Sequence, residues 1–164
     1  MQSINLSLKV IKNEDCEILL KWISKKRIRF FLSSAFRQKK ISLNILKMIT
    51  KKNNSKWYII LVNKIKIGCV VLDDIDSEDK IANLWYLIGD EKYLKKNIAY
   101  NILNNFLKKN SMKLNAVTAW VSSSNISSNK LLTKLKFTKM AKIPKTFKIG
   151  KKYYDRILYF KSLR

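Results

Sequence analysis

Hydrophobic positions along the chain follow two spacings, one typical of strands and one typical of helices. Apolar and polar residues alternate over 4–10, as in a strand with one buried face. Alternating or continuous apolar runs predict further strands, at about 57–62, 65–72, 81–88, 116–121, 137–142 and 153–160. Helical spacing predicts four helices, over about 13–23, 42–50, 98–109 and 125–135. The mixture of these elements predicts an α/β (α+β) fold.

Short polar segments mark the turns between these elements. Asn63 and Lys64 form a tight turn between two strands that pair antiparallel. Gly68, inside the second of these strands, indicates a bulge or the close approach of another backbone. The acidic residues of 73–79 are expected to make the next turn. Gly89 ends the strand that follows, and a polar loop over 90–97 leads into the third helix.

The composition indicates one compact domain, residues 1–164, because three glycines, one proline and 47% hydrophobic residues suit a chain that buries its own core. No apolar run approaches the roughly 18–20 residues of a membrane span, and residues 1–10 lack a secretory signal pattern. Cys16 and Cys69 are too few for a disulfide framework, and the absence of histidine argues against zinc or haem. We therefore expect a soluble, cytoplasmic protein without a metal.

The formal net charge of +24 is the strongest compositional feature. Lysine supplies 30 of the 35 basic residues, in a chain also rich in isoleucine and asparagine, which is what an AT-rich coding sequence produces. Part of the charge therefore reflects codon usage. The remaining positive field concentrates anions, which leaves nucleic acid, acidic phospholipid and phosphorylated small molecules open as partners.

Four segments resemble, in order and spacing, those of the GNAT superfamily of N-acetyltransferases, in particular its ribosomal-protein, polyamine and nucleotide-sugar branch. They are Ile67–Val70, Ala82–Asp90, Asn125–Phe137 and Gly150–Tyr159. The third ends like the leucine-glycine-phenylalanine signature of that family. The resemblance implies a GNAT fold, with a mixed central sheet of six to seven strands and about four helices on both faces. It also implies acetyl-CoA as co-substrate and direct acetyl transfer to a primary amine.

The same resemblance implies a coenzyme site at the loop before the third helix, where backbone N–H groups bind a pyrophosphate. The family's two loop glycines fall on Lys95 and Asn97, followed by the small residue Ala99. Asn97 tolerates a left-handed backbone, whereas Lys95 is expected to take an ordinary conformation with its side chain outward. The implied coenzyme-binding residues are Leu87, Ile88, Lys95, Lys96, Asn97, Ile98, Ala99, Asn125 and Ser128.

Each of these assignments has a structural alternative. Lys95 and Lys96 can form part of a solvated loop, and Asn125 and Ser128 can simply cap a helix. The acidic stretch at 73–79 is either a solvated turn or a binding site for a cationic amine.

We further expect the strands around 85–88 and 116–121 to run parallel and to diverge, which would admit the pantetheine arm.

The acceptor side of the site is implied to involve Phe36, Arg37, Asn83 and Trp85, although Trp85 also suits a core or a pocket wall. Asn83 stands where many relatives have a glutamate, and Leu132 replaces a tyrosine that often serves as the acid. The chain has no histidine, so no catalytic residue is assigned. Positioning of the reactants, with water as proton acceptor, can supply a large share of catalysis.

Three functions follow from these observations. The first is N-acetylation of a small molecule, for which a phosphorylated, acidic acceptor such as an amino-sugar nucleotide suits the positive charge best. The second is N-acetylation of a protein such as a ribosomal protein, and a polyamine acceptor ranks lower because the surface would repel it. The third is a non-catalytic nucleic-acid-binding protein that keeps the fold, which the scarcity of arginine disfavours. The protein is expected to be a monomer or a homodimer.

Overall fold

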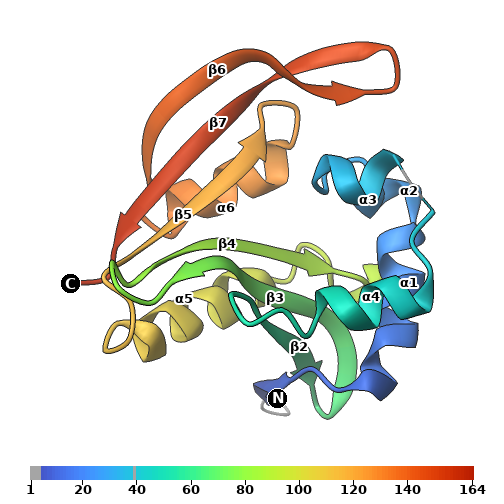
Figure 1. Cartoon of the computed structure of the whole chain (residues 1–164). Coiled ribbons are helices and arrows are strands. Elements are labelled where there is room, and N and C mark those ends of the chain that lie inside the picture. Colours follow the sequence, from blue (N-terminus) through green and yellow to red (C-terminus); the bar gives the residue numbers. More distant parts are fainter. Residues whose placement is uncertain (1–4, 39) are drawn as a thin grey trace.

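The computed structural model describes residues 5–38 and 40–164, and seven strands of this part form one mixed sheet (Figure 1). The strands lie in the order β1-β2-β3-β4-β5-β7-β6. All neighbours are antiparallel except β4 and β5, which are parallel. The expected mixed sheet is confirmed, while Ile4 lies outside the described residues. The bounds are β1 (Leu6–Val10), β2 (Lys56–Val62), β3 (Ile65–Asp76), β4 (Ile81–Ile88), β5 (Ala116–Ser122), β6 (Thr138–Ile149) and β7 (Lys152–Ser162).

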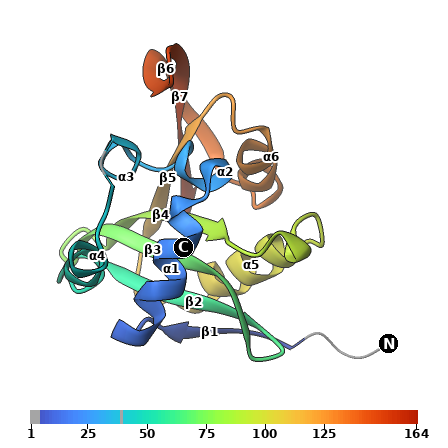
Figure 2. The ribbon, with the colours of Figure 1, turned by 90° about the vertical axis from the view of Figure 1, so that its right-hand side faces the viewer.

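Helices cover both faces of this sheet. The four expected helices are present, and the described residues contain two further short ones, α2 and α3, in a basic segment without a sustained helical spacing. Figure 2 shows α4 and α5 on opposite sides of the sheet. The bounds are α1 (Cys16–Ser24), α2 (Lys26–Arg29), α3 (Ser34–Gln38), α4 (Leu43–Ile49), α5 (Ile98–Asn110) and α6 (Ile126–Lys134), with short 3-10 turns at Asn13–Asp15 and Glu91–Tyr93.

Two hydrophobic clusters form the core, one on each face of the sheet. The first packs α5 and α6 against the sheet and includes Val70 and Leu103, and the second packs α1 and α4 and includes Cys69. Successive residues of β3 thus enter different clusters, which is why its sequence is a nearly continuous apolar run.

The β2–β3 hairpin confirms the predicted turn at Asn63 and Lys64 and the predicted bulge or close backbone approach at Gly68. Asn63 and Lys64 have φ of 48° and 69°, as a tight two-residue hairpin turn requires. The strand register shifts between Ile60 and Leu61, which is a bulge opposite the Gly68 region. A Cβ on Gly68 would lie 2.2 Å from the carbonyl oxygen of Leu87. Gly68 is therefore required by the close approach of β4.

The acidic stretch is only partly a turn, which corrects the sequence prediction. β3 continues to Asp76, and the turn itself occupies residues 77–80. The side chain of Asp76 accepts hydrogen bonds from the backbone N–H groups of Glu78 and Asp79, both at 2.9 Å. The strand extends further than predicted because cross-strand pairing with β4, a tertiary interaction, continues past the apolar run.

Asp15 is a fully buried carboxylate at the start of α1. It accepts hydrogen bonds from Lys9 Nζ at 2.8 Å and the backbone N–H of Lys12 at 2.9 Å, and its ion pair with Lys66 Nζ is 2.7 Å long. Burial by itself raises the pKa of Asp15, but the hydrogen bonds from Lys66, Lys9 and Lys12 together hold that pKa below its ordinary value. The Asp15 carboxylate thus links the start of α1 to β1 through Lys9 and to β3 through Lys66.

A lysine takes the place of the signature glycine at the end of α6. Lys136 has φ of 61°, and its N–H donates to the carbonyl of Thr133 at 2.9 Å. The N–H of Phe137 donates to the carbonyl of Leu132 at 3.0 Å. These two bonds make a Schellman motif, whose left-handed residue is usually glycine.

Candidate active site

β4 and β5 pair over only three residues and then separate. The parallel register joins Ile81 to Ala116, Ala82 to Val117 and Asn83 to Thr118. β4 continues to Ile88 and β5 to Ser122 without further pairing between the two in the described residues, and Figure 1 shows them diverging. The predicted parallel, diverging strands are confirmed. The end of β4 therefore presents backbone toward β5 that no β5 residue pairs with.

The loop at this end of β4 takes two left-handed residues before α5. Asn97 has φ of 56°, as predicted, but Lys95 has φ of 58°, so the expectation of an ordinary conformation for Lys95 is wrong. Both are the positions aligned with the family's glycines. The path from the turn at Glu91–Tyr93 to α5 sets these dihedrals and overrides the preference of a lysine side chain. Next to them, Ile98 is buried in the core and Ala99 is half-buried.

The start of α5 offers backbone donors in a positive environment. Asn97 makes no side-chain capping hydrogen bond to the first turn of α5. Its side-chain oxygen instead accepts a hydrogen bond from Lys134 Nζ of α6 at 3.2 Å, and Lys95 and Lys96 are exposed beside it. The helix dipole and these three lysines favour an anion at this point.

The start of α6 contacts β4 through two hydroxyl groups. The side-chain oxygen of Asn125 accepts from the N–H of Ser128 at 3.3 Å, which confirms the predicted cap. Ser128 Oγ lies 3.2 Å from the hydroxyl of Tyr86 on β4. Burial raises the pKa of Tyr86, partly offset by its hydrogen bond with Ser128, so its hydroxyl stays neutral near pH 7. No local pattern singles out Tyr86 as a site residue, because its contact with Ser128 is tertiary.

On β4, Asn83 and Trp85 face the side opposite to Tyr86. This side faces the second hydrophobic cluster, to which α1 and α4 contribute. The rings of Trp85 and Phe36 of α3 lie 6.2 Å apart, and that of Trp57 lies 5.0 Å from Trp85. The side-chain oxygen of Asn83 is buried and has no hydrogen-bond partner among the described residues. The structure thus brings together Phe36, Asn83 and Trp85, three of the four residues expected on the acceptor side, at the place where the strands diverge.

Arg37, the fourth expected acceptor residue, reaches the β6–β7 hairpin. Its Nη1 donates to the carbonyl of Lys148, and its guanidinium carbon lies 4.0 Å from the centre of the Phe147 ring. Burial lowers the pKa of Arg37, and the positive charge of Arg156 lowers it further. Arg156 is a residue that the sequence analysis missed, because nothing local connects β7 to α3.

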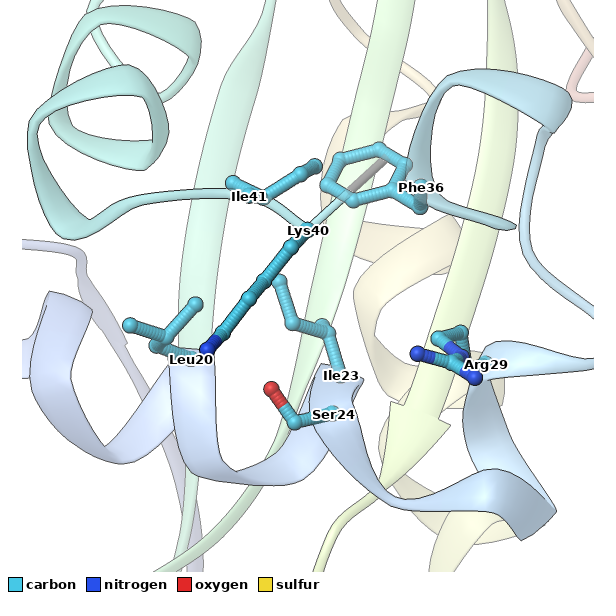
Figure 3. Close-up of a pocket in the computed structure, with 7 residues that line it drawn as sticks. All are labelled: Leu20, Ile23, Ser24, Arg29, Phe36, Lys40 and Ile41. Atoms are coloured by element: carbon cyan, nitrogen blue, oxygen red, sulfur yellow. The ribbon is translucent and has the colours of Figure 1, made fainter. Parts of the chain in front are cut away.

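A small pocket lies between α1, α2 and the segment after α3 (Figure 3), formed by Leu20, Ile23, Ser24, Arg29, Phe36, Lys40 and Ile41. Phe36 is the one residue that it shares with the predicted site. None of the residues expected to bind coenzyme lines it.

Residues 5–38 and 40–164, the part of the chain that the structure describes, contain neither a metal-ligand cluster nor a membrane-spanning helix. No group of three or more acidic, cysteine or histidine side chains is arranged to hold a metal ion there. No helix in this part is long and apolar enough to cross a membrane.

The family profile for the acetyltransferase (GNAT) domain matches residues 5–138. The chain belongs to the GNAT acetyltransferase family. This membership supports N-acetyltransferase activity, as the resemblance of the four sequence segments implied. No curated protein matches the chain in a sequence comparison.

Solved GNAT structures share the whole fold at low sequence identity. The spermidine N-acetyltransferase from Vibrio cholerae, in complex with CoA and spermine, has a TM-score of 0.85 at 17% identity, over 96% of this chain and 95% of that one. RimL, a ribosomal L7/L12 alpha-N-protein acetyltransferase in complex with coenzyme A, has a TM-score of 0.83 at 15% identity, over 98% of each chain. These two neighbours bind CoA but act on different kinds of amine, so they establish the fold and not the acceptor.

Proposed function

We propose that the protein transfers the acetyl group of acetyl-CoA to a primary amine of a small molecule. The observation that carries this proposal is the separation of β4 from β5 beyond Asn83 and Thr118, beside the uncapped start of α5. A strand edge that no other strand pairs with and a helix start without a side-chain cap both offer backbone N–H groups to a ligand. The carbonyl of Ile88 already accepts a hydrogen bond from Arg27 Nη2 at 3.1 Å. An extended amide-bearing arm that ends in a pyrophosphate fits both.

In this proposal the pyrophosphate lies on the loop and first turn of α5, with Lys95, Lys96, Asn97, Ile98 and Ala99. Left-handed residues in a loop are typical of backbone anion sites, and the helix dipole adds positive potential at the start of α5. The pantetheine arm would run along the backbone of Leu87 and Ile88 and pass Asn125 and Ser128 at the start of α6. These residue roles stay predictions.

The chemistry follows from the groups present. A neutral amine attacks the thioester carbonyl, an N–C bond forms, the C–S bond breaks, and one proton leaves the amine. The buried oxygen of Asn83 can accept a hydrogen bond from that amine, but an amide cannot act as a base, so water takes the proton. Catalysis therefore depends chiefly on orientation, which can lower a bimolecular barrier substantially.

The charge around the acceptor side disfavours a polyamine. Between Glu17 and Asp73 the sequence has no acidic residue, and this interval contains nearly all of α1 and the whole of α2, α3 and α4. A cationic acceptor would find no carboxylate there. An amino-sugar nucleotide stays our preferred acceptor, and a protein amine is the second. The cytoplasmic location and the monomeric or dimeric state stay predictions.

Calorimetric titration with acetyl-CoA tests the proposal. We expect one site per chain, weakened in Lys95→Glu by repulsion of the phosphates, with a loss that shrinks when salt is raised. Lys51→Glu, an exposed change of the same charge just after α4, is the matched control and should bind like the parent. An absence of binding would refute the proposal. Binding of DNA or RNA instead, steeply dependent on salt, would favour the non-catalytic alternative.

A further inference from the structure

Two arginines from distant parts of the chain lie on one aromatic ring. The guanidinium carbon of Arg37, on α3, is 4.0 Å from the centre of the Phe147 ring, and that of Arg156, on β7, is 5.4 Å from it. Phe147 is only 5% exposed, although the rest of β6 is largely exposed. Both guanidinium groups therefore lie against the same ring, and we call Arg37, Phe147 and Arg156 the arginine cluster.

The arginine cluster has positive charge without a negative partner. All eleven acidic residues lie in the described part of the chain, and no ion pair there includes Arg37 or Arg156. Asp155, next to Arg156, points to the other side of β7, where it pairs with Lys142 at 2.9 Å and accepts from the N–H of Lys145 at 3.0 Å.

The Nε atoms of both arginines are buried, and neither has a hydrogen-bond partner in the described residues. A buried donor without a partner costs free energy, and two guanidinium groups on one ring repel each other. One anion that accepts hydrogen bonds from both Nε–H groups would remove both costs.

Contacts place the arginine cluster on the acceptor side of the diverging strands. Phe36, adjacent to Arg37, packs on Trp85, and the guanidinium carbon of Arg156 lies 6.0 Å from the ring of Trp120. Trp85 and Trp120 each follow by two residues the last β4–β5 pair, Asn83 and Thr118. The coenzyme loop precedes α5, which covers the other face of the sheet. An anion in the cluster is therefore distinct from the coenzyme pyrophosphate.

We propose that Arg37 and Arg156 together bind a phosphate group of the acceptor and so select phosphorylated amines. This inference rests on the proposed function, since it concerns the acceptor of that reaction. A phosphate monoester carries about −1.5 to −2 charges at pH 7 and three acceptor oxygens, which matches two guanidinium groups. A carboxylate would leave one positive charge uncompensated. Arginine suits this role better than the abundant lysines because its planar guanidinium group can donate hydrogen bonds to two oxygens at once.

Nuclear magnetic resonance of the arginine side chains tests the site directly. The chain has five arginines, so at most five Nε–H signals are expected, and Arg37→Lys and Arg156→Lys assign two of them. Inorganic phosphate is titrated at constant ionic strength into protein saturated with CoA. We expect saturable shifts of the Arg37 and Arg156 signals and none of the Arg27, Arg29 and Arg164 signals. Uniform shifts of all five, or no shift of Arg37 and Arg156, would overturn the proposal.

Binding of matched sugars then tests the selectivity. On CoA-saturated protein, glucosamine 6-phosphate should bind about ten- to a hundredfold more tightly than glucosamine, as expected for charge-assisted hydrogen bonds. Arg156→Gln should remove this preference and leave CoA affinity unchanged. Lys152→Gln, an exposed residue of the same strand with the same loss of charge, should keep it.

The two proposals fail in different ways. CoA binding with equal affinity for both sugars would overturn the phosphate site and keep the acetyltransferase proposal. Equally tight binding of glucosaminuronate, the amino sugar with a carboxylate at C6, would overturn the choice of phosphate. If phosphate shifts the Arg37 and Arg156 signals in a protein that does not bind CoA, the anion site is supported but its role in acetyl transfer is refuted.

Discussion

Replacing Lys95 by glycine should stabilise the protein, although the loop belongs to the candidate coenzyme site. Lys95 has φ of 58°, and its side chain is exposed. A residue with a Cβ in the left-handed region costs about 1–2 kcal/mol, which glycine avoids. Glycine also makes the unfolded chain more flexible, at a cost of about 0.4–1 kcal/mol. The difference predicts a gain of about 0.5–1 kcal/mol.

The chain offers matched comparisons for this change. Lys96, next to Lys95, does not have a positive φ, so Lys96→Gly should lose about 0.4–1 kcal/mol through the unfolded state alone. Asn97→Gly should gain less than Lys95→Gly, because asparagine tolerates φ of 56° better than lysine does. Lys136→Gly, in the Schellman motif after α6, should gain about as much as Lys95→Gly.

Thermal and urea unfolding measure these differences, with about 2–4 °C expected per kcal/mol for a chain of this size. Acetyl-CoA titration of the same four variants separates stability from binding. Asn97→Gly should preserve or improve affinity, since the phosphate-facing backbone is kept and no charge is lost. Lys95→Gly should weaken affinity through the lost positive charge, and Lys136→Gly should not change it. The reasoning is refuted if Lys95→Gly and Lys96→Gly change the free energy of unfolding equally, because their backbone conformations would then not matter.

Three other changes probe the rest of the fold. Asn125→Ala should cost about 0.5–2 kcal/mol by removing the cap on Ser128, and Asn125→Ser should recover most of it, as urea unfolding measures; equal losses would contradict a capping role. Because the pKa of Asp15 is lowered in the folded state, its contribution is complete above the unfolded pKa near 4 and disappears as pH falls through the folded pKa. Asp15→Asn should thus lower the free energy of unfolding at pH 7 by about 1–3 kcal/mol. It should also make that free energy less dependent on pH below about 4. Gly68→Ala should cost more than Gly150→Ala, because its Cβ would meet the Leu87 carbonyl, while alanine at position 150 meets open space and adds only the cost of a left-handed backbone at φ of 60°; similar melting temperatures would count against this contact.

The order and type of most elements follow from local patterns in the sequence. The apolar run along 81–88 and the helical spacing along 98–109 depend only on residues a few positions apart. The strand is buried on both faces and the helix on one. The turn at Asn63–Lys64, the close approach at Gly68 and the cap at Asn125 could be predicted for the same reason. The short helices α2 and α3 could not, because the packing of Ile28 and Phe36 into the second hydrophobic cluster, and not a long local repeat, stabilises them.

The candidate site depends more on the tertiary structure. Lysine at position 95 disfavours a left-handed backbone, yet the path between β4 and α5 imposes one, since the free energy of docking α5 exceeds the cost of one strained residue. The arginine cluster joins α3 to β6 and β7, more than one hundred positions away in the sequence. No local pattern encodes that contact, because Arg37, Phe147 and Arg156 meet only when the whole sheet has formed. The sequence by itself therefore determined the elements and the family, whereas the tertiary structure decided which charges meet at the acceptor side.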